Sequence, residues 1–112
     1  MKLYVISLPD AEERRERATI QLAHAGIPFE FFEALRGEQA MAEGHFERCD
    51  DDEWLLNTGR EVTPAEIGCF ASHQSMWQKC VELGEPIVIM EDDFQLLPGF
   101  VDALEQASRN ID

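Results

Sequence analysis

Short apolar runs rich in β-branched and aromatic residues alternate with longer helical patterns along this chain of 112 residues. The runs cover residues 2–7, 29–33 and 86–90. Runs with little polar alternation are typical of strands in a parallel sheet that is covered on both faces. Parallel neighbours need a crossover of a dozen or more residues, and the intervals between the runs are long enough for one. The order predicts a single α/β domain over residues 1–112, with about three parallel strands flanked by helices.

Helix start and stop signals lie in the intervals between these runs. At the strongest start, Thr63 caps the helix, Pro64 occupies the first turn and Glu66 reaches back to the cap. Asp10 and Glu13 resemble a second capping box. The predicted helices span residues 11–25, 64–83 and 100–108. Residues 36–62 are irregular and acidic, and we predict a loop or short helix there, because a long irregular stretch in a small domain is often functional.

The helix predicted to end at Leu83 is apolar around much of its girth, so we expect it to be largely buried. One apolar stripe consists of Ile67, Phe70, Ala71, Trp77 and Val81. A second consists of Cys69, His73, Met76, Cys80 and Leu83. A polar strip contains Ser72, Ser75, Lys79 and Glu82.

The chain is strongly acidic, with a formal net charge of −14. This argues against nucleic-acid binding, which needs a basic surface, and against docking on anionic lipid. We expect no transmembrane segment, since no apolar run approaches the about 20 residues that a span requires. The first eight residues are too short for a signal peptide. Three cysteines without CxxC spacing favour a reduced, cytoplasmic chain.

The sharpest candidate for chemistry is the triplet Glu91-Asp92-Asp93, which directly follows the third predicted strand. Ligands of open α/β sheets bind beyond the carboxyl ends of the strands. Three carboxylates at such a place repel one another unless a cation lies among them, and Mg²⁺ and Mn²⁺ prefer oxygen ligands. A metal there could bridge nucleotide phosphates. A solvated acidic turn is the alternative, and the position at a strand end favours the metal.

Two further groups could contact phosphate. His73 could be a ligand or a hydrogen-bond donor, although a packed histidine that donates to a backbone carbonyl is commoner. Arg14, Arg15 and Arg17 lie just beyond the first predicted strand. Arginine suits phosphate oxygens, but pairing with acidic neighbours one helical turn away is its commoner fate.

Zinc is a weaker hypothesis. Cys69 and His73 are four residues apart, and Cys80 follows further along the same predicted helix. This spacing can place zinc ligands on one face, but no fourth ligand has a convincing position, and a buried cysteine behaves as a small hydrophobe. A second weak cluster consists of His45, Cys49 and residues 50–52.

Three segments together resemble glycosyltransferase family 25, the lipopolysaccharide-biosynthesis glycosyltransferases that are related to collagen galactosyltransferases. The order and spacing of the segments agree with the family over about residues 1–97. The segments are Val5-Ile-Ser-Leu8 followed by Glu13-Arg-Arg15, Thr63-Pro-Ala-Glu-Ile-Gly-Cys-Phe-Ala-Ser-His73 with Trp77, and Ile87-Val-Ile-Met-Glu-Asp-Asp93.

The resemblance implies a Rossmann-like GT-A fold and transfer of a sugar, often galactose, from a UDP-sugar to a glycan or lipid-linked glycan such as lipopolysaccharide. It implies that Asp93 and Glu91 bind Mn²⁺ or Mg²⁺ at the donor diphosphate, and that Glu91 or Asp92 contacts the ribose or a metal-bound water. Ser72 and His73 would line the donor pocket or brace a loop, Arg14 would approach the phosphates, and Gly68 would allow close packing. We expect localisation in the cytoplasm, at most peripheral at the inner face of the membrane.

The chain departs from the family pattern at Ser7, where asparagine is usual, and at Ala65, where glycine is usual. The family's catalytic domain is about twice this length, a size more typical of a nucleotide-sugar enzyme. We therefore expect a truncated sheet that resembles the N-terminal half, with further strands, much of the acceptor site and the general base lacking. No candidate for that base follows Asp93. An unpaired sheet edge would favour self-association into a homo-oligomer.

Two other classes of protein compete with an enzyme. A receiver-like signalling domain also holds Mg²⁺ at strand ends, but it needs its acidic pair after the first strand, which here ends in Ser7-Leu8-Pro9. A non-catalytic nucleotide-sugar-binding or assembly module would bind the donor in the presence of metal without turnover.

Overall fold

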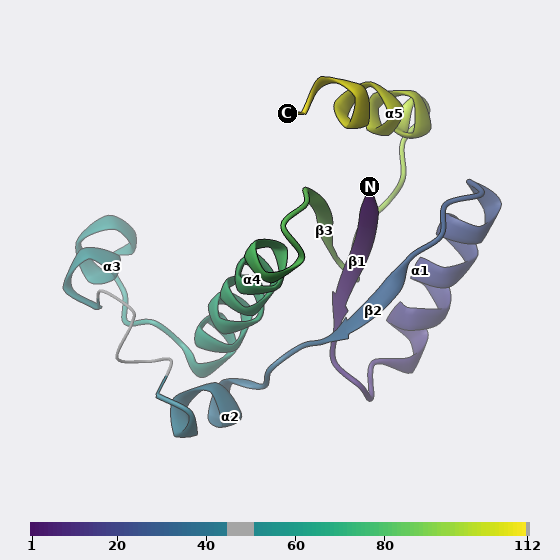
Figure 1. The fold of residues 1–112 in the computed structure, drawn as a ribbon. Coiled ribbons are helices and arrows are strands. Elements are labelled where there is room, and N and C mark those ends of the chain that lie inside the picture. Colours follow the sequence, from purple (N-terminus) through teal and green to yellow (C-terminus); the bar gives the residue numbers. More distant parts are fainter. Residues whose placement is uncertain (45–50, 112) are drawn as a thin grey trace.

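The computed structural model describes residues 1–44 and 51–111, and Figure 1 shows the arrangement of its elements. Along the chain these elements are β1 Lys2–Ser7, α1 Glu12–His24, β2 Glu30–Glu33, α2 Gly37–Ala42, α3 Asp51–Thr58, α4 Pro64–Leu83, β3 Ile87–Glu91 and α5 Phe100–Asn110. The predicted α/β class is confirmed. The stretch predicted as loop or short helix holds α2 and α3. The weak cluster around His45 and Cys49 lies mostly outside the described residues.

The strands form a parallel sheet in the order β2-β1-β3. In the centre of the sheet, Ile6 is in register with Phe32 of β2 and with Glu91 of β3. The carboxyl ends of the three strands therefore meet at one edge. Only β1 is buried on both faces, while β2 and β3 are half-buried, so the expectation of fully buried strands holds for the central one alone.

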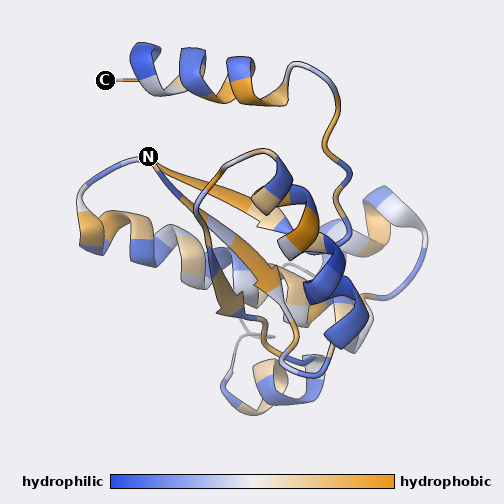
Figure 2. Ribbon diagram, turned by 90° about the vertical axis from the view of Figure 1, so that its right-hand side faces the viewer, coloured by the Kyte–Doolittle hydropathy of each residue, from blue (hydrophilic) through white to orange (hydrophobic). Residues whose placement is uncertain are grey.

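Alternate residues of β1 feed two apolar layers. Leu3 and Val5 pack with Ala18 and Leu22 of α1 on one face. Tyr4 and Ile6 pack with Met76 of α4 on the other. The sheet therefore lies between α1 and α4, with hydrophobic strands in the middle (Figure 1, Figure 2). This layered arrangement follows from the period of two along a strand.

The helix starts differ in how well local sequence predicted them. At α4 the capping box of Thr63 and Glu66 is present, with Pro64 in the first turn, as predicted. At α1 the predicted capping box is wrong, because the N-cap is Ala11 and no side chain bonds to it. The carboxylate of Asp10 instead forms an ion pair with Arg36, just after β2.

The prediction that α4 is largely buried is also wrong. Trp77 is 54% exposed and Val81 is 81% exposed, whereas Ser72, assigned to a polar strip, is 1% exposed. A helix beside a single small sheet can bury only one face. The helices that the structure describes include none that is long and apolar enough to cross a lipid bilayer.

Glycine lets α4 approach the segment that leads into α2. A Cβ atom added to Gly68 would lie 2.6 Å from the Leu35 carbonyl oxygen, and one added to Gly37 would lie 2.0 Å from the Pro64 carbonyl oxygen. Behind this contact Ala40, Ile67 and Ala71 form a third apolar cluster. The close approach expected for Gly68 is therefore present, and it fixes the segment after β2 against the first turns of α4.

Candidate functional site

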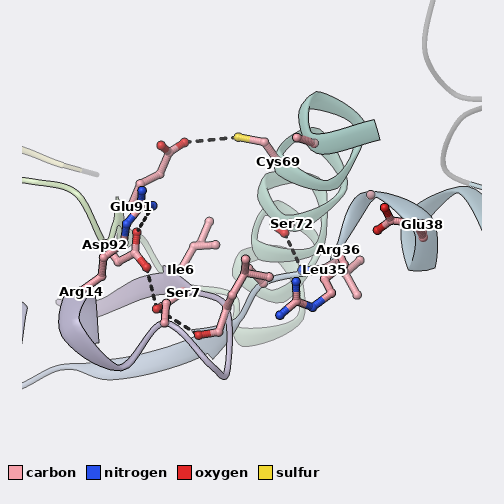
Figure 3. A pocket seen from close by; sticks show the side chains of 15 residues that line it. Ile6, Ser7, Arg14, Leu35, Arg36, Glu38, Cys69, Ser72, Glu91 and Asp92 are labelled. Carbon is pink, nitrogen blue, oxygen red and sulfur yellow. Dashed lines mark hydrogen bonds and ion pairs between the residues drawn. The ribbon is translucent and has the colours of Figure 1, made fainter. Parts of the chain in front are cut away.

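A pocket of about 500 Å³ opens at the edge of the sheet where the strands end (Figure 3). Its polar lining comes from several elements that are far apart in the sequence: Ser7, Arg14, Arg36, Glu38, Cys69, Ser72, Glu91 and Asp92. This is the edge at which parallel α/β sheets bind ligands. The topology therefore brings together residues that are up to 85 positions apart in sequence.

Asp92 is the most firmly held acid of the triplet. The Ser7 hydroxyl donates to Asp92 Oδ2 at 2.7 Å, and Arg14 Nη1 donates to Asp92 Oδ1 at 3.4 Å. The Asp92 side chain is only 10% exposed. Arg14 thus reaches across to the acid after β3 instead of pairing with acidic neighbours on its own helix.

The Arg15 side chain forms hydrogen bonds with backbone carbonyls at the carboxyl end of β1. Its Nε donates to the Leu8 carbonyl at 3.1 Å and its Nη2 donates to the Ser7 carbonyl at 3.0 Å. The guanidinium carbon also lies 4.7 Å from the centroid of the Phe31 ring. Arg15 therefore holds the turn that carries Ser7. Of the three arginines considered from sequence, Arg17 is exposed and is not among the residues that line the pocket.

Glu91 makes two contacts through one oxygen. Its Oε1 lies 2.9 Å from His73 Nε2 and accepts a hydrogen bond from Cys69 Sγ at 3.4 Å. The hydrogen bond with His73 lowers the pKa of Glu91 against an opposing effect of burial. Burial raises the pKa of the Cys69 thiol, and the nearby carboxylates of Glu91 and Asp93 raise it further. The partner of His73 is thus a carboxylate and not the backbone carbonyl expected of a packed histidine.

Ser72 occupies the buried wall of the pocket. Its Oγ accepts the Leu35 backbone N–H at 2.9 Å and donates to the Gly68 carbonyl at 2.8 Å. Ser72 thereby ties α4 to the segment after β2. Asp93, in contrast, is exposed, next to Asp92, and it is not among the lining residues.

The sequence reading missed Arg36 and Glu38. Both line the pocket from the segment that follows β2. The signal was available, because Arg36 lies three residues after the second predicted strand and the carboxyl ends of all parallel strands share one edge.

The carboxylates at this edge can be compared with the ligands that a hard divalent cation requires. Glu91 and Asp93 are both exposed carboxylates, and the two hydrogen bonds to Glu91 end on Oε1. Carboxylate oxygens are the ligands that Mg²⁺ and Mn²⁺ prefer. The ligand chemistry of Glu91 and Asp93 therefore suits such an ion, whereas both Asp92 oxygens are already bonded to Ser7 and Arg14.

Known proteins align with this chain over most of its length. Lipooligosaccharide biosynthesis protein lic2B of Haemophilus influenzae is 39% identical over 94 residues, which cover 83% of this chain and 34% of that protein. Lacto-N-neotetraose biosynthesis glycosyltransferase LgtB of Neisseria meningitidis serogroup A is 39% identical over 108 residues, or 88% of this chain and 34% of that protein. The chain thus spans about a third of the length of these bacterial relatives.

An animal relative aligns with almost the whole chain. The probable inactive glycosyltransferase 25 family member 3 of Bos taurus is 31% identical over 117 residues, covering 99% of this chain and 19% of that protein. The model of glycosyltransferase family 25 (LPS biosynthesis protein) matches residues 1–112. The resemblance carried by the three sequence segments is therefore confirmed, and the chain belongs to glycosyltransferase family 25.

Proposed function

We propose that this chain forms the donor-binding part of a glycosyltransferase. The enzyme transfers a sugar from a UDP-sugar to a lipopolysaccharide or other glycan acceptor, and galactose is the first candidate for that sugar. Membership of family 25 supports a nucleotide-sugar donor and a sugar acceptor. The two bacterial relatives bear names from lipooligosaccharide and lacto-N-neotetraose biosynthesis. Because the chain spans about a third of them, the complete transfer is assigned to the whole protein.

The observation that carries the proposal is the pocket at the carboxyl edge of the sheet. Arg14, Glu91 and Asp92 reach it from α1 and from the end of β3 (Figure 3). Its volume of about 500 Å³ lies within the range of small-molecule sites. A strongly acidic chain that binds a diphosphate needs a cationic partner in the site, and Arg14 supplies one such charge.

Within the pocket each residue takes a separate part. Asp93 and Glu91 would hold Mn²⁺ or Mg²⁺, and the ion would supply positive charge against the leaving diphosphate. Arg14 lies beside Asp92 and faces the phosphates. Asp92, already oriented by Ser7, accepts from a ribose hydroxyl. Ser72 and His73 support this arrangement from α4, one through Leu35 and the other through Glu91.

Thermal unfolding tests the proposal. UDP-galactose with Mn²⁺, at about 100 times the dissociation constant, should stabilise the chain by about 2.7 kcal/mol, a shift of several degrees. Mn²⁺ alone, and UDP-galactose with a chelator, should give smaller shifts. The Asp93→Ala variant should lose the combined effect, whereas Asp102→Ala, an exposed acid on α5, should keep it. A shift that is equal in both variants, or no shift at all, would contradict the donor site.

A non-catalytic donor-binding module is the second candidate. The observation that favours it is the bovine relative named as probably inactive, which aligns with 99% of this chain. Release of UDP from UDP-galactose in the presence of acceptor separates the two functions. Metal-dependent stabilisation without UDP release from the full-length protein would support the module, and release would support the enzyme.

A further inference from the structure

Cys69, His73 and Glu91 form a cluster of three different ligand types at the rim of the pocket. Cys69 and His73 lie one turn apart on α4, and Glu91 is the last residue of β3. One ligand atom from each residue lies within 4.8 Å of the other two. Sulfur, nitrogen and oxygen atoms are thus gathered around one point.

The third member of this cluster differs from the residue that helical spacing suggested. The Cys80 thiol donates a hydrogen bond to the Glu85 carbonyl at 3.2 Å, near the C-terminal end of α4. It therefore takes no part in the group, and the reading of Cys69, His73 and Cys80 as a ligand set is wrong. Parallel pairing of β3 with β1 supplies Glu91 in its place.

The two separations that involve the Glu91 oxygen are close to those of a tetrahedral ion. Zinc bonds of about 2.3 Å to sulfur and about 2.0–2.2 Å to nitrogen and oxygen place the ligand atoms about 3.3–3.6 Å apart. The observed separations are 3.4 Å between Cys69 Sγ and Glu91 Oε1 and 2.9 Å between His73 Nε2 and the same oxygen. Each lies within about 0.5 Å of the tetrahedral value.

The charges of the cluster also suit a divalent cation. One thiolate and one carboxylate together carry two negative charges, which neutralise one divalent cation, and the imidazole binds as a neutral ligand. Binding transfers the Cys69 proton to solvent, because the thiolate is the ligand form. Asp93 adds a further negative charge that acts on the thiol. The His73 and Glu91 side chains are 29% and 49% exposed, so an ion from solvent can reach the cluster.

We propose that Cys69, His73 and Glu91 form a site for a thiophilic divalent cation, with Zn²⁺ as the ion that fits best. Its mixed sulfur, nitrogen and oxygen ligands distinguish it from the oxygen-only Mn²⁺ or Mg²⁺ site of the proposed function. Three protein ligands and one open position form the pattern of a zinc ion that remains accessible to a further ligand.

Cobalt(II) is the probe, because a bond between cobalt and thiolate gives a sulfur-to-metal charge-transfer band. Titration of the chain with Co²⁺ and a phosphine reductant should produce the band, and Zn²⁺ should remove it, since zinc binds such sites more tightly. The Cys69→Ser variant should lack the band. The double variant Cys49→Ser/Cys80→Ser, in which Cys69 is the sole thiol, should retain it. No band in the wild type, or a band lost only in the double variant, overturns the proposal.

One further comparison separates this site from the donor site. Asp93→Ala should keep the cobalt band and lose the stabilisation by UDP-galactose with Mn²⁺. His73→Gln should weaken Co²⁺ binding by about 10-fold or more. Retention of wild-type Co²⁺ affinity by His73→Gln would contradict the three-ligand site, whatever the outcome for UDP-galactose.

Discussion

Gly68 is a residue whose missing side chain shapes the site. The Leu35 carbonyl oxygen and the Gly37 nitrogen would lie 2.6 and 2.9 Å from a Cβ at this position, and both are backbone atoms. The Leu35 N–H is in turn the donor to Ser72. An added methyl group would therefore displace the segment after β2 that forms one wall of the pocket.

We predict that Gly68→Ala destabilises the chain by about 1–3 kcal/mol, as expected for a group forced into a packed contact. Helix propensity alone would change stability in the opposite direction by about 1 kcal/mol. Urea denaturation of both proteins gives the sign of the effect. A more stable variant would show that α4 and the segment after β2 can separate without loss.

Glu91 takes part in both metal sites that we propose. A zinc ion on Cys69, His73 and Glu91 would occupy a carboxylate that the Mn²⁺ site also needs. We predict that Zn²⁺, added to the chain with UDP-galactose and Mn²⁺, removes their thermal stabilisation. Cys69→Ser should resist this effect of Zn²⁺. Stabilisation that increases further with Zn²⁺ would mean that the two ions bind side by side.

At the scale of the element, α4 depends on its first turn. The Glu66 carboxylate accepts from Arg60 at 2.6 Å and from the Thr63 hydroxyl at 2.8 Å. The pKa of Glu66 is lowered from 4.5 to about 2, chiefly by the hydrogen bond from Arg60 and also by the bonds from Thr63. Near the start of a helix a carboxylate also meets the positive end of the helix dipole.

We predict that this first turn makes stability depend on pH in acid. Because the pKa of Glu66 is lower in the folded chain, the unfolded chain binds more protons than the folded chain between pH 4.5 and about pH 2. The contribution of Glu66 to the free energy of unfolding is therefore complete above pH 4.5 and is lost as the pH falls toward 2. Thermal unfolding across this range should show a flatter profile for Glu66→Gln than for the wild type. Equal slopes would contradict the prediction.

Local chemistry explains which elements could be predicted from sequence. The box of Thr63 and Glu66 lies within one helical turn, so the sequence alone identifies it. Asp10 offered the same local signal, but its carboxylate forms an ion pair with Arg36, which follows β2 in the chain. The exposure of Trp77 and Val81 depends on how much of the sheet stands opposite α4, which no periodicity encodes.

The same distinction holds within the site. The rule for strand ends located the acids after β3 and the arginines after β1. It could not assign Glu91 to Cys69 and His73, because that contact depends on how α4 lies against the end of β3. Nor could it show that Asp92 is the acid held by Ser7, since this bond depends on the strand order.

At the scale of the whole molecule, the described chain is more open than its length suggests. Its radius of gyration is 15.8 Å, against about 13 Å for a compact domain of this size. No residue of α5 within the described range is buried, and Leu104 is only partly buried where it packs against the cluster of Leu3 and Val5. The large apolar side chains that face solvent include Trp77, Val81 and Leu97.

We predict that the 112-residue chain forms homo-oligomers as salt is added. Apolar surface favours association, while the net charge of −14 opposes it. Salt shortens the reach of that repulsion to about 10 Å at 0.1 M. Sedimentation velocity at low and high salt should therefore show larger species in high salt, and Trp77→Gln should reduce them. A single monomeric species under both conditions would contradict this expectation.

The position of β1 in the middle of the sheet affects the order of events during synthesis. β1 leaves the ribosome before β3, yet Lys2 pairs with Ile87 and Ser7 bonds to Asp92, 85 residues later. At about 5–20 residues per second, the nascent chain carries an unsatisfied edge of β1 for on the order of 4–17 s. The early unit of β1, α1 and β2 can form in that interval, but the pocket cannot. The binding site is thus among the last parts of this segment to be made, and a chaperone that shields β1 would act before any ligand can.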